Sequence, residues 1–466
     1  MLRSFRLQNH RSFLGEAEFS LLPAYSSSRS AVTVTAIYGA NAAGKSNLLD
    51  GLRFMTMAVR NSYRQWDPSA GVPRQPFKLS AEGQQEPSTF VVDLMLGGVQ
   101  HVYGFVINDE TVLEEWLYTY PHRRKRMLFE RDGDGIRFGS TAIDHRGKVE
   151  FLAELTRPNA LFLSAAAQAG LREFLPVREW LTHDLQWGGH RSFPIRSAGI
   201  DSLPDLIAHS EESRESVLRL IRAADLGITD IVMEPDETAR SFRKERIERD
   251  LTTLRLQFKH MDPDDSLFSQ REERLAQLSL LLEQVNSQPV PQRMLFSHGN
   301  DVLFDMDEES AGTRSWMTNL PLFLWALKKG KTLVVDEMDT SLHPHLMAFL
   351  IGLFASEESN TEGAQLLFAT HNASLLGTSL GDELLKRDQI WFIEKDVGGN
   401  SILYPLTDFH PRKGENRERR YLAGSYGAVP VIDDVLHSCC WPENGSPAVA
   451  GPDDRLDGGG HIDDPA

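Results

Sequence analysis

One eight-residue stretch constrains the fold more than any other part of the chain. Residues 39–46, Gly-Ala-Asn-Ala-Ala-Gly-Lys-Ser, match the pattern G-x-x-x-x-G-K-[ST] of a phosphate-binding loop. The preceding segment, 31–38, is β-branched and alternating in polarity, which predicts a strand. The following segment, 47–58, carries apolar residues at helical spacing. A strand, a glycine-containing loop and a helix in this order form the context that such a loop requires.

The residue types in this loop suit the binding of a polyphosphate. Gly39 and Gly44 let backbone N–H groups turn inward without a Cβ in the way. The helix that follows adds its dipole and its unpaired N–H groups. Lys45 is expected to reach the β- and γ-phosphates of a nucleotide, and Ser46 is expected to bind Mg²⁺. A chance match is the alternative, and the flanking strand and helix argue against it.

Composition limits the class of protein. The length of 466 residues allows about two to four domains, and the hydrophobic and charged fractions, 41% and 25%, are ordinary for a globular protein. A net charge of -17 argues against a broad nucleic-acid-coating surface, although it leaves room for a local basic cleft. The only cysteines, Cys439 and Cys440, are adjacent, which excludes a disulfide framework and fits a reducing compartment. Without an apolar run of membrane-spanning length or a signal peptide, a cytoplasmic protein is expected.

A second group of polar residues follows two apolar strands near the C-terminal end. Residues 332–335 predict a short buried strand that ends in Asp336 and Glu337. An Asp in this place holds the Mg²⁺ shell, and the adjacent Glu can polarise an attacking water molecule. Residues 365–369 predict another buried strand, which leads to His371. His371 is expected to contact the γ-phosphate or the attacking water, and a turn histidine that caps the next helix is the alternative.

Other segments predict an antiparallel meander and a helical region. Strands are expected at 2–7, 17–21, 90–96, 101–107, 112–120, 127–129, 292–297, 301–305, 389–394 and 401–404. Helices are expected at 149–155, 171–185 and 203–224, and an antiparallel helical hairpin at 234–260 and 266–288 around a turn at 261–265. The basic run 122–126 either contacts nucleic acid or is a solvated hairpin edge.

In this order the segments resemble an ATP-binding-cassette-type head of the SMC, RecF and OLD-like branch. The match extends from residue 1 to about 430 and rests on six motifs in register. These motifs are the phosphate loop with Asn41 and the trailing 47–49, the opening 9–13, a signature at 310–313, a Walker B strand at 333–337, a D-loop at 339–344 and the switch histidine His371.

Within this branch the chain resembles compact AAA-type ATPases of prokaryotic defence loci, similar to the ATPase subunits of abortive-infection, Septu and PARIS systems. Segments 161–164, 309–313 and 420–430 carry this resemblance, although the last has no chemistry that follows from its residues. The signature Ser-Ala-Gly-Thr differs from the LSGGQ-like sequence of transporters, which argues against a transporter subunit. Fewer than 100 residues follow His371, so a nuclease domain of the OLD type is not expected.

The resemblance implies an α/β fold, an ABC-type P-loop ATPase head in which a mixed sheet is joined by an antiparallel β-meander and an inserted helical subdomain. The expected domains are an N-terminal lobe at 1–147, a helical insertion at 148–291, a C-terminal lobe at 292–431 and a disordered tail at 432–466.

The resemblance also implies an ATPase that uses ATP and Mg²⁺ and dimerises head to head around the nucleotide. Residues expected to contact the nucleotide are Gly39, Asn41, Gly44, Lys45, Ser46, Asn47 and Arg11, with Ser310 and Gly312 supplied by the second copy. Ser46 and Asp336 are expected to hold the metal, and Glu337, His371 and Lys45 to carry catalysis. Such a protein would regulate an effector in anti-phage defence. The alternatives are a RecF-like ATPase that binds DNA and a nucleotide-bound scaffold that hydrolyses slowly.

Overall fold

The computed structural model describes residues 1–25, 29–139, 146–188, 203–224, 226–258, 268–299, 302–340, 342–378, 380, 383–410 and 415–430. Residues 1–429 form one compact unit, which contains the described helices and strands. The predicted turn at 261–265 and the predicted tail at 432–466 lie outside the described residues.

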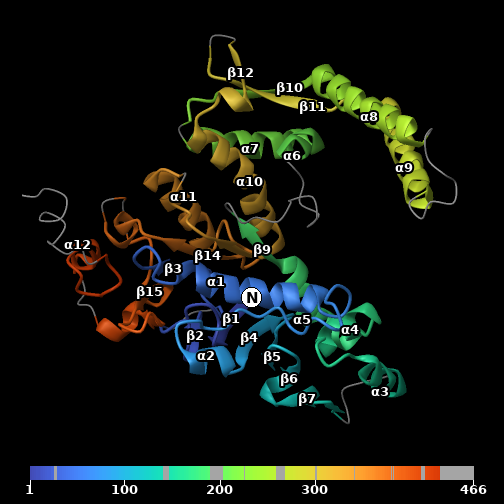
Figure 1. Cartoon of the computed structure of the whole chain (residues 1–466). Coiled ribbons are helices and arrows are strands. Elements are labelled where there is room, and N and C mark those ends of the chain that lie inside the picture. The colour runs from blue at the N-terminus through green and yellow to red at the C-terminus, as the bar shows by residue number, and fades with distance from the viewer. Residues whose placement is uncertain are drawn as a thin grey trace, which may run out of the picture. The chain divides into compact units, whose positions relative to one another are not determined.

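A six-stranded mixed sheet positions the candidate site (Figure 1). Its strand order is β16-β15-β3-β14-β13-β9. The strands are β3 (Val34–Tyr38), β9 (Leu185–Gly188), β13 (Thr332–Val335), β14 (Gln365–Thr370), β15 (Ile390–Lys395) and β16 (Ser401–Pro405). All neighbouring pairs are parallel except β15 with β16. The carboxyl ends of five parallel strands therefore meet at one edge of the sheet, where α/β folds bind their ligands.

This sheet is buried on both faces, which explains the nearly continuous apolar sequence of its strands. Side chains alternate between the two faces along a strand. On β14, Leu367 and Ala369 belong to one apolar cluster, and Leu366 and Phe368 belong to the other. The first cluster contains residues of a seven-stranded antiparallel sheet, described next, and of helix α1 (Lys45–Asn61). The second contains residues of α10 (Ala311–Lys329) and α11 (Pro344–Ala355).

The predicted meander is part of a seven-stranded antiparallel sheet with the order β2-β1-β4-β5-β6-β7-β8. Its strands are β1 (Leu2–Gln8), β2 (Ala17–Ser20), β4 (Ser88–Leu96), β5 (Val99–Ile107), β6 (Val112–Tyr120), β7 (Arg126–Asp132) and β8 (Gly135–Phe138). Strand β8 has only four residues and was not predicted. It pairs with β7 through a tight turn at 133–134.

Short helices connect the two sheets. They are α2 (Ala81–Gln85), α3 (Arg146–Leu155), α4 (Phe162–Gln168) and α5 (Leu175–Glu179), and α12 (Arg417–Leu422) follows the last strand. The prediction of one helix over 171–185 is wrong. Residues 172–184 form consecutive short helical turns, and residue 185 begins β9. Pairing with β13 decides this conformation, which the local apolar spacing does not reveal.

The helical region between β9 and α10 has two parts. In the first, α6 (Leu203–His209) and α7 (Glu211–Ala223) pack into the second apolar cluster beside a sheet of order β10-β11-β12. The strands are β10 (Asp230–Pro235), β11 (Gln292–Ser297) and β12 (Leu303–Asp305). The single helix predicted over 203–224 breaks at Ser210, whose hydroxyl accepts the Ser213 N–H at 3.1 Å as an N-cap.

The second part is the predicted helical hairpin, α8 (Glu237–Phe258) and α9 (Phe268–Ser287). The two helices have a small apolar core of their own, built from Ile247, Leu251, Leu278 and Val285. No helix of the described segments is long and apolar enough to cross a membrane.

Candidate nucleotide-binding site

The phosphate loop lies between β3 and α1, as the sequence predicted. Both of its fixed glycines are required by close contacts. A Cβ on Gly39 would lie 2.5 Å from the carbonyl oxygen of Ile393. A Cβ on Gly44 would lie 2.3 Å from the Ser401 hydroxyl, and Gly44 has a φ of +124°, which L side chains rarely adopt. The loop is therefore pressed against the hairpin of β15 and β16.

Lys45 is buried at the start of α1. Its Nζ donates hydrogen bonds to the backbone oxygens of Gly39, at 2.7 Å, and Ala40, at 3.1 Å. Burial lowers the pKa of Lys45, and the nearby carboxylates of Asp339, Asp336 and Glu337 partly offset this effect. The lysine is thus held inside the loop and faces a group of acids.

The acids follow β13. The Oδ1 atom of Asp336 is buried and accepts no hydrogen bond. Burying a carboxylate oxygen in this way costs free energy unless a cation or a hydrogen-bond donor contacts it. Mg²⁺ prefers such oxygen ligands and usually takes only one or two from the protein, the others being phosphate and water oxygens. Among the residues that the structure describes, no group of three His, Cys, Asp or Glu side chains that could hold a metal by itself occurs. Asp336 and Ser46 therefore fit a Mg²⁺ ion that is shared with a bound polyphosphate.

Glu337 is exposed and has a left-handed backbone with a φ of +53°. This conformation is unfavourable for a non-glycine residue and is often found at functional sites. The Thr340 hydroxyl lies 3.5 Å from Glu337 Oε2. The turn after β13 therefore directs a carboxylate away from the buried sheet.

His371 follows β14, the strand beside β13. Asp339 makes two contacts with this histidine. One of its carboxylate oxygens accepts the His371 backbone N–H at 3.1 Å and also lies 3.1 Å from the ring Nε2. The Asp339 side chain is only 6% exposed, and its other oxygen has no hydrogen-bond partner. The sequence did not single out Asp339 as a site residue, although it lies in the D-loop segment.

A cavity of about 530 Å³ brings most of the predicted residues together. It is lined by residues 41–47 of the loop and by Glu337, Thr340, His371 and Lys395. Thr340 and Lys395 were missed by the sequence analysis. Lys395 ends a buried strand at the same sheet edge as the other site residues, but the order of the strands, which places it there, is not visible in the sequence.

Some predicted residues are not among those that line this cavity. Gly39 and Asp336 lie next to its lining, one at the start of the loop and the other directly before Glu337. Ser310 is exposed and caps α10, where its hydroxyl accepts the Thr313 N–H at 3.0 Å, and Gly312 lies within the first turn of that helix. The signature residues are therefore not brought to the loop of their own chain.

Arg11 also lies outside the cavity lining. Its guanidinium forms an ion pair with Asp50 of α1. Burial opposes ionisation of Asp50, but the hydrogen bond to His10 and the charge of Arg11 lower its pKa overall. Arg11 is thus engaged with the helix that follows the loop and not with the cavity.

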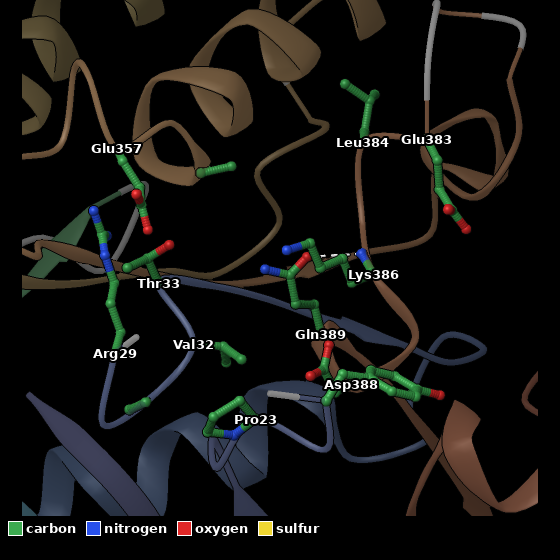
Figure 2. A pocket seen from close by; sticks show the side chains of 13 residues that line it. Pro23, Arg29, Val32, Thr33, Glu357, Glu383, Leu384, Lys386, Asp388 and Gln389 are labelled. Atoms are coloured by element: carbon green, nitrogen blue, oxygen red, sulfur yellow. Dashed lines mark hydrogen bonds between the residues drawn. The ribbon is translucent and has the colours of Figure 1, made fainter. Parts of the chain in front are cut away.

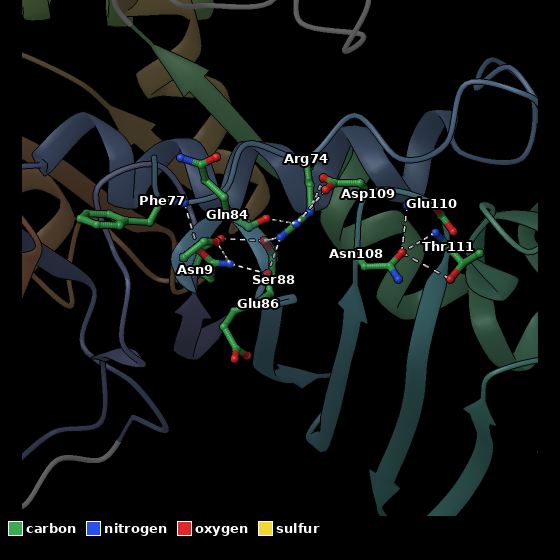
Figure 3. Close-up of polar contacts among 11 residues, drawn as sticks. Asn9, Arg74, Phe77, Gln84, Glu86, Ser88, Asn108, Asp109, Glu110 and Thr111 are labelled. Atoms are coloured by element: carbon green, nitrogen blue, oxygen red, sulfur yellow. Dashed lines mark hydrogen bonds and ion pairs between the residues drawn. The ribbon is translucent and has the colours of Figure 1, made fainter. Parts of the chain in front are cut away.

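The turn at residues 9–13 contacts the residues that follow the phosphate loop, and Figure 3 shows the hydrogen bonds that hold Asn9 of this turn in place. Asn9, which is fully buried, donates to the backbone oxygens of Gly83 and Glu86 and accepts the Phe77 N–H at 2.9 Å. Ser12 of the same turn accepts a hydrogen bond from the Asn47 side chain at 2.7 Å. The predicted polar turn is therefore a fixed part of the site's framework.

A second cavity, of about 380 Å³, lies where the chain enters β3, at the opposite end of that strand (Figure 2). Arg29, Lys386, Glu357, Glu383 and Asp388 give it a mixed charge. It contains none of the motif residues, and its opposing charges do not indicate a particular ligand.

Comparisons with known proteins give a family match and several structural likenesses. No curated protein matches the chain. The head domain of an SMC protein bound to the C-terminal winged-helix domain of ScpA is similar in structure, with 12% identity over 87% of this chain and 97% of that one, and a TM-score of 0.39. The recombination mediator RecF with ATP is similar with 14% identity over the same shares and a TM-score of 0.27. A family model described as "AAA domain, putative AbiEii toxin, Type IV TA system" matches residues 34–377. Because this match covers most of the chain, the protein belongs to that family of AAA-domain proteins.

Proposed function

We propose that the protein binds and hydrolyses ATP, and that two copies close face to face around the nucleotide to control a partner effector. The observation that carries this proposal is the meeting of Lys45, Asp336, Glu337 and His371 at one edge of the sheet. These residues follow three neighbouring parallel strands and lie far apart in sequence.

In the proposed mechanism each residue has a separate task. Lys45 and the backbone N–H groups of the loop bind the β- and γ-phosphates. Asp336 and Ser46 hold Mg²⁺, which when bound neutralises charge on the phosphate oxygens. Glu337 orients and polarises the attacking water. His371, whose ring Nε2 is engaged by Asp339, contacts the attacking water or the γ-phosphate through its other ring nitrogen.

The signature residues support a site that two copies complete. Ser310 is exposed and lies outside the cavity around the loop of its own chain. A second copy facing the loop would bring its Ser310 hydroxyl and Gly312 N–H group to the γ-phosphate. Hydrolysis would remove this bridge, so that ATP acts as a switch for the dimer.

The first test of this function uses two substitutions with different expected effects. Lys45→Ala should abolish ATP binding, because the loop loses its buried cation. Glu337→Gln should retain ATP binding but lower kcat by about 100-fold or more, since the water is no longer polarised. It should also accumulate as an ATP-dependent dimer, which size-exclusion chromatography with light scattering measures. If Glu337→Gln stays monomeric at saturating ATP, the face-to-face switch is wrong.

A partner effector and a role in anti-phage defence are supported by the family description, which names a toxin and a type IV toxin–antitoxin system. The experiment is affinity capture of the Glu337→Gln protein from its native host in the presence of ATP. A partner that binds this variant but not Lys45→Ala would support an effector controlled by the nucleotide state. Equal capture by both variants would contradict this control.

A second candidate function is ATP-dependent DNA binding. It is favoured by a hollow beside the basic hairpin between β6 and β7, lined by Arg3, His122 and Arg123 among others. Arg123, Arg124 and Lys125 are all exposed there. DNA-stimulated ATPase activity that falls steeply with salt would favour this function over effector control. A third candidate, a scaffold that hydrolyses slowly, would retain ATP without releasing phosphate.

A further inference from the structure

The final hairpin, β15 and β16, places a lysine beside the phosphate loop that no nucleotide-binding motif of the sequence includes. Phe392 of β15 pairs with Tyr38 at the end of β3, so residues 393–395 run alongside the start of the loop. The carbonyl of Ile393 is so close to Gly39 that it excludes a side chain there. Lys395 ends the strand and lines the same cavity as Lys45, Ser46 and His371.

The Lys395 side chain is directed toward the loop by strand geometry. Lys395 and Ser401 are paired across the hairpin, and paired residues of an antiparallel ladder project from the same face. The Ser401 hydroxyl contacts the loop, at 2.6 Å from the carbonyl oxygen of Ala43. The neighbouring Glu394 faces the other way, where its carboxylate accepts the Ala428 N–H at 3.3 Å.

The cationic group of Lys395 is available for a ligand. Its side chain is exposed, and it makes no ion pair with any residue in the described parts of the chain. The other adjacent acid, Asp396, is engaged in the turn, where one carboxylate oxygen accepts the N–H groups of Gly398 and Asn400, both at 2.9 Å. The cavity is thus lined by two lysines, of which only Lys45 belongs to the phosphate-loop motif.

The hairpin that carries Lys395 is fixed relative to the loop. The Ser401 backbone N–H donates to the Ser12 carbonyl at 2.7 Å, and the hydroxyls of these two serines are 2.7 Å apart. The Asn400 side chain accepts the Leu14 N–H at 2.8 Å. The backbone at Lys395 therefore needs little rearrangement when the lysine binds a phosphate, which favours a contribution to affinity.

We infer that Lys395 is a second phosphate-binding lysine, which binds the nucleotide's polyphosphate from the side of the loop opposite to the water-activating residues. The inference rests on the proposed ATP binding. Strand order sets the side, because β15 flanks β3 on one side and β14 and β13, with His371 and Glu337, lie on the other. Lys395 therefore contributes to the binding of ATP and ADP alike and not to the attack of water.

The test is the affinity of Lys395→Gln for Mg-ATP and Mg-ADP, measured by isothermal titration calorimetry beside steady-state ATPase kinetics. Both dissociation constants should rise about tenfold, as expected for one charge-assisted contact to phosphate. KM should rise in parallel, whereas kcat should change less than about twofold. Lys395→Arg retains the charge and should bind within about threefold of the wild type. The salt dependence of the dissociation constant should be weaker in Lys395→Gln than in the wild type.

Lys244→Gln is the matched control, because it removes the same charge from an exposed site on α8, outside the cavity. Equal affinities of Lys395→Gln and Lys244→Gln would overturn the inference, as would an equal loss in Lys395→Gln and Lys395→Arg. A large fall in kcat at unchanged KM would also overturn it. If the wild type itself binds neither nucleotide, the proposed function fails instead, so the two failures are distinguishable.

Discussion

At the scale of single residues, the conformation of the phosphate loop depends on contacts with distant residues as much as on its own sequence. Gly39 and Gly44 fit the motif for a nucleotide, yet the atoms that exclude a side chain at these positions belong to β15 and β16. Lys45 is similarly held by two carbonyl oxygens of its own loop. The loop is therefore preorganised by contacts that span the whole chain.

Substitution of Gly39 tests this close contact. Gly39→Ala places a Cβ 2.5 Å from the Ile393 carbonyl oxygen, a backbone atom that cannot move aside cheaply. We expect a loss of about 1–3 kcal/mol in the free energy of unfolding, together with weaker ATP binding. Chemical denaturation and calorimetry measure the two effects.

Gly15→Ala is the control for this substitution, because a Cβ at Gly15 meets no atom within 4 Å. Its free energy of unfolding should stay within about 0.5 kcal/mol of the wild type. If Gly39→Ala is equally stable, the contact between the loop and β15 is looser than the structure indicates.

At the scale of elements, one buried side chain joins the two large sheets. Gln365 at the start of β14 is fully buried. Its amide oxygen accepts the Leu2 N–H at 2.6 Å, and its amide nitrogen donates to the carbonyl oxygens of Leu2, at 2.8 Å, and Val32, at 3.0 Å. These bonds satisfy backbone groups of β1 and of the segment that leads into β3.

Gln365→Leu should therefore be strongly destabilising. The substitution keeps the volume but leaves buried backbone groups of Leu2 and Val32 without partners, each of which costs about 1–3 kcal/mol. We expect a loss on the order of 3 kcal/mol in chemical denaturation. Gln292→Leu, at an exposed position of β11, is the control and should change stability by less than about 0.5 kcal/mol. Similar values for both variants would show that Gln365 does not join the sheets.

At the scale of the whole molecule, the hairpin of α8 and α9 packs around an apolar core that is separate from the two large apolar clusters. Its apolar core uses residues of these two helices alone. Its two ends are held together, because Pro235 pairs with Gln292 and the Asp236 N–H donates to the Pro291 carbonyl at 2.7 Å. The ladder of β10 and β11 therefore reaches the base of the hairpin.

Replacing residues 237–290 by Asn-Gly should leave the ATPase head intact. Asn-Gly is a favoured two-residue turn between antiparallel strands, so β10 and β11 can continue into each other. We expect cooperative unfolding and an unchanged dissociation constant for ATP, measured by circular dichroism and calorimetry.

Removal of residues 203–224 is the contrasting control, because this segment supplies Leu203, Ile207, Val217, Leu218 and Ile221 to the second apolar cluster. This variant should not fold. Loss of ATP binding in the Asn-Gly variant would show instead that the hairpin is needed for the head.

Much of the fold could be predicted from local sequence patterns. The strand, loop and helix at 34–61, the meander and the helical hairpin follow recognisable sequence patterns, and the structure confirms them. The missed strands β8, β9 and β10 have four to six residues. The partners of β9 and β10 lie far away in the chain, whereas β8 closes a short hairpin with β7. Short segments of this kind carry too little periodicity to be recognised alone.

The residues of the candidate site also fall into those that could be predicted from the sequence and those that could not. Lys45, Ser46, Asp336, Glu337 and His371 could be named from the sequence, because each directly follows a recognisable strand or loop pattern. Asp339 and Lys395 could not, since their importance depends on which strands are neighbours and on which face a side chain projects.

The sequence by itself therefore determined that this chain has a phosphate loop and paired acids, and that it belongs to the AAA-domain family. Only the tertiary structure decided that β15 lies beside β3, that Ser401 supports the loop and that a second lysine faces the same cavity. The physical reason is that steric and hydrogen-bonding preferences of neighbouring residues act locally. Strand order and register depend instead on burying the apolar faces of distant segments together.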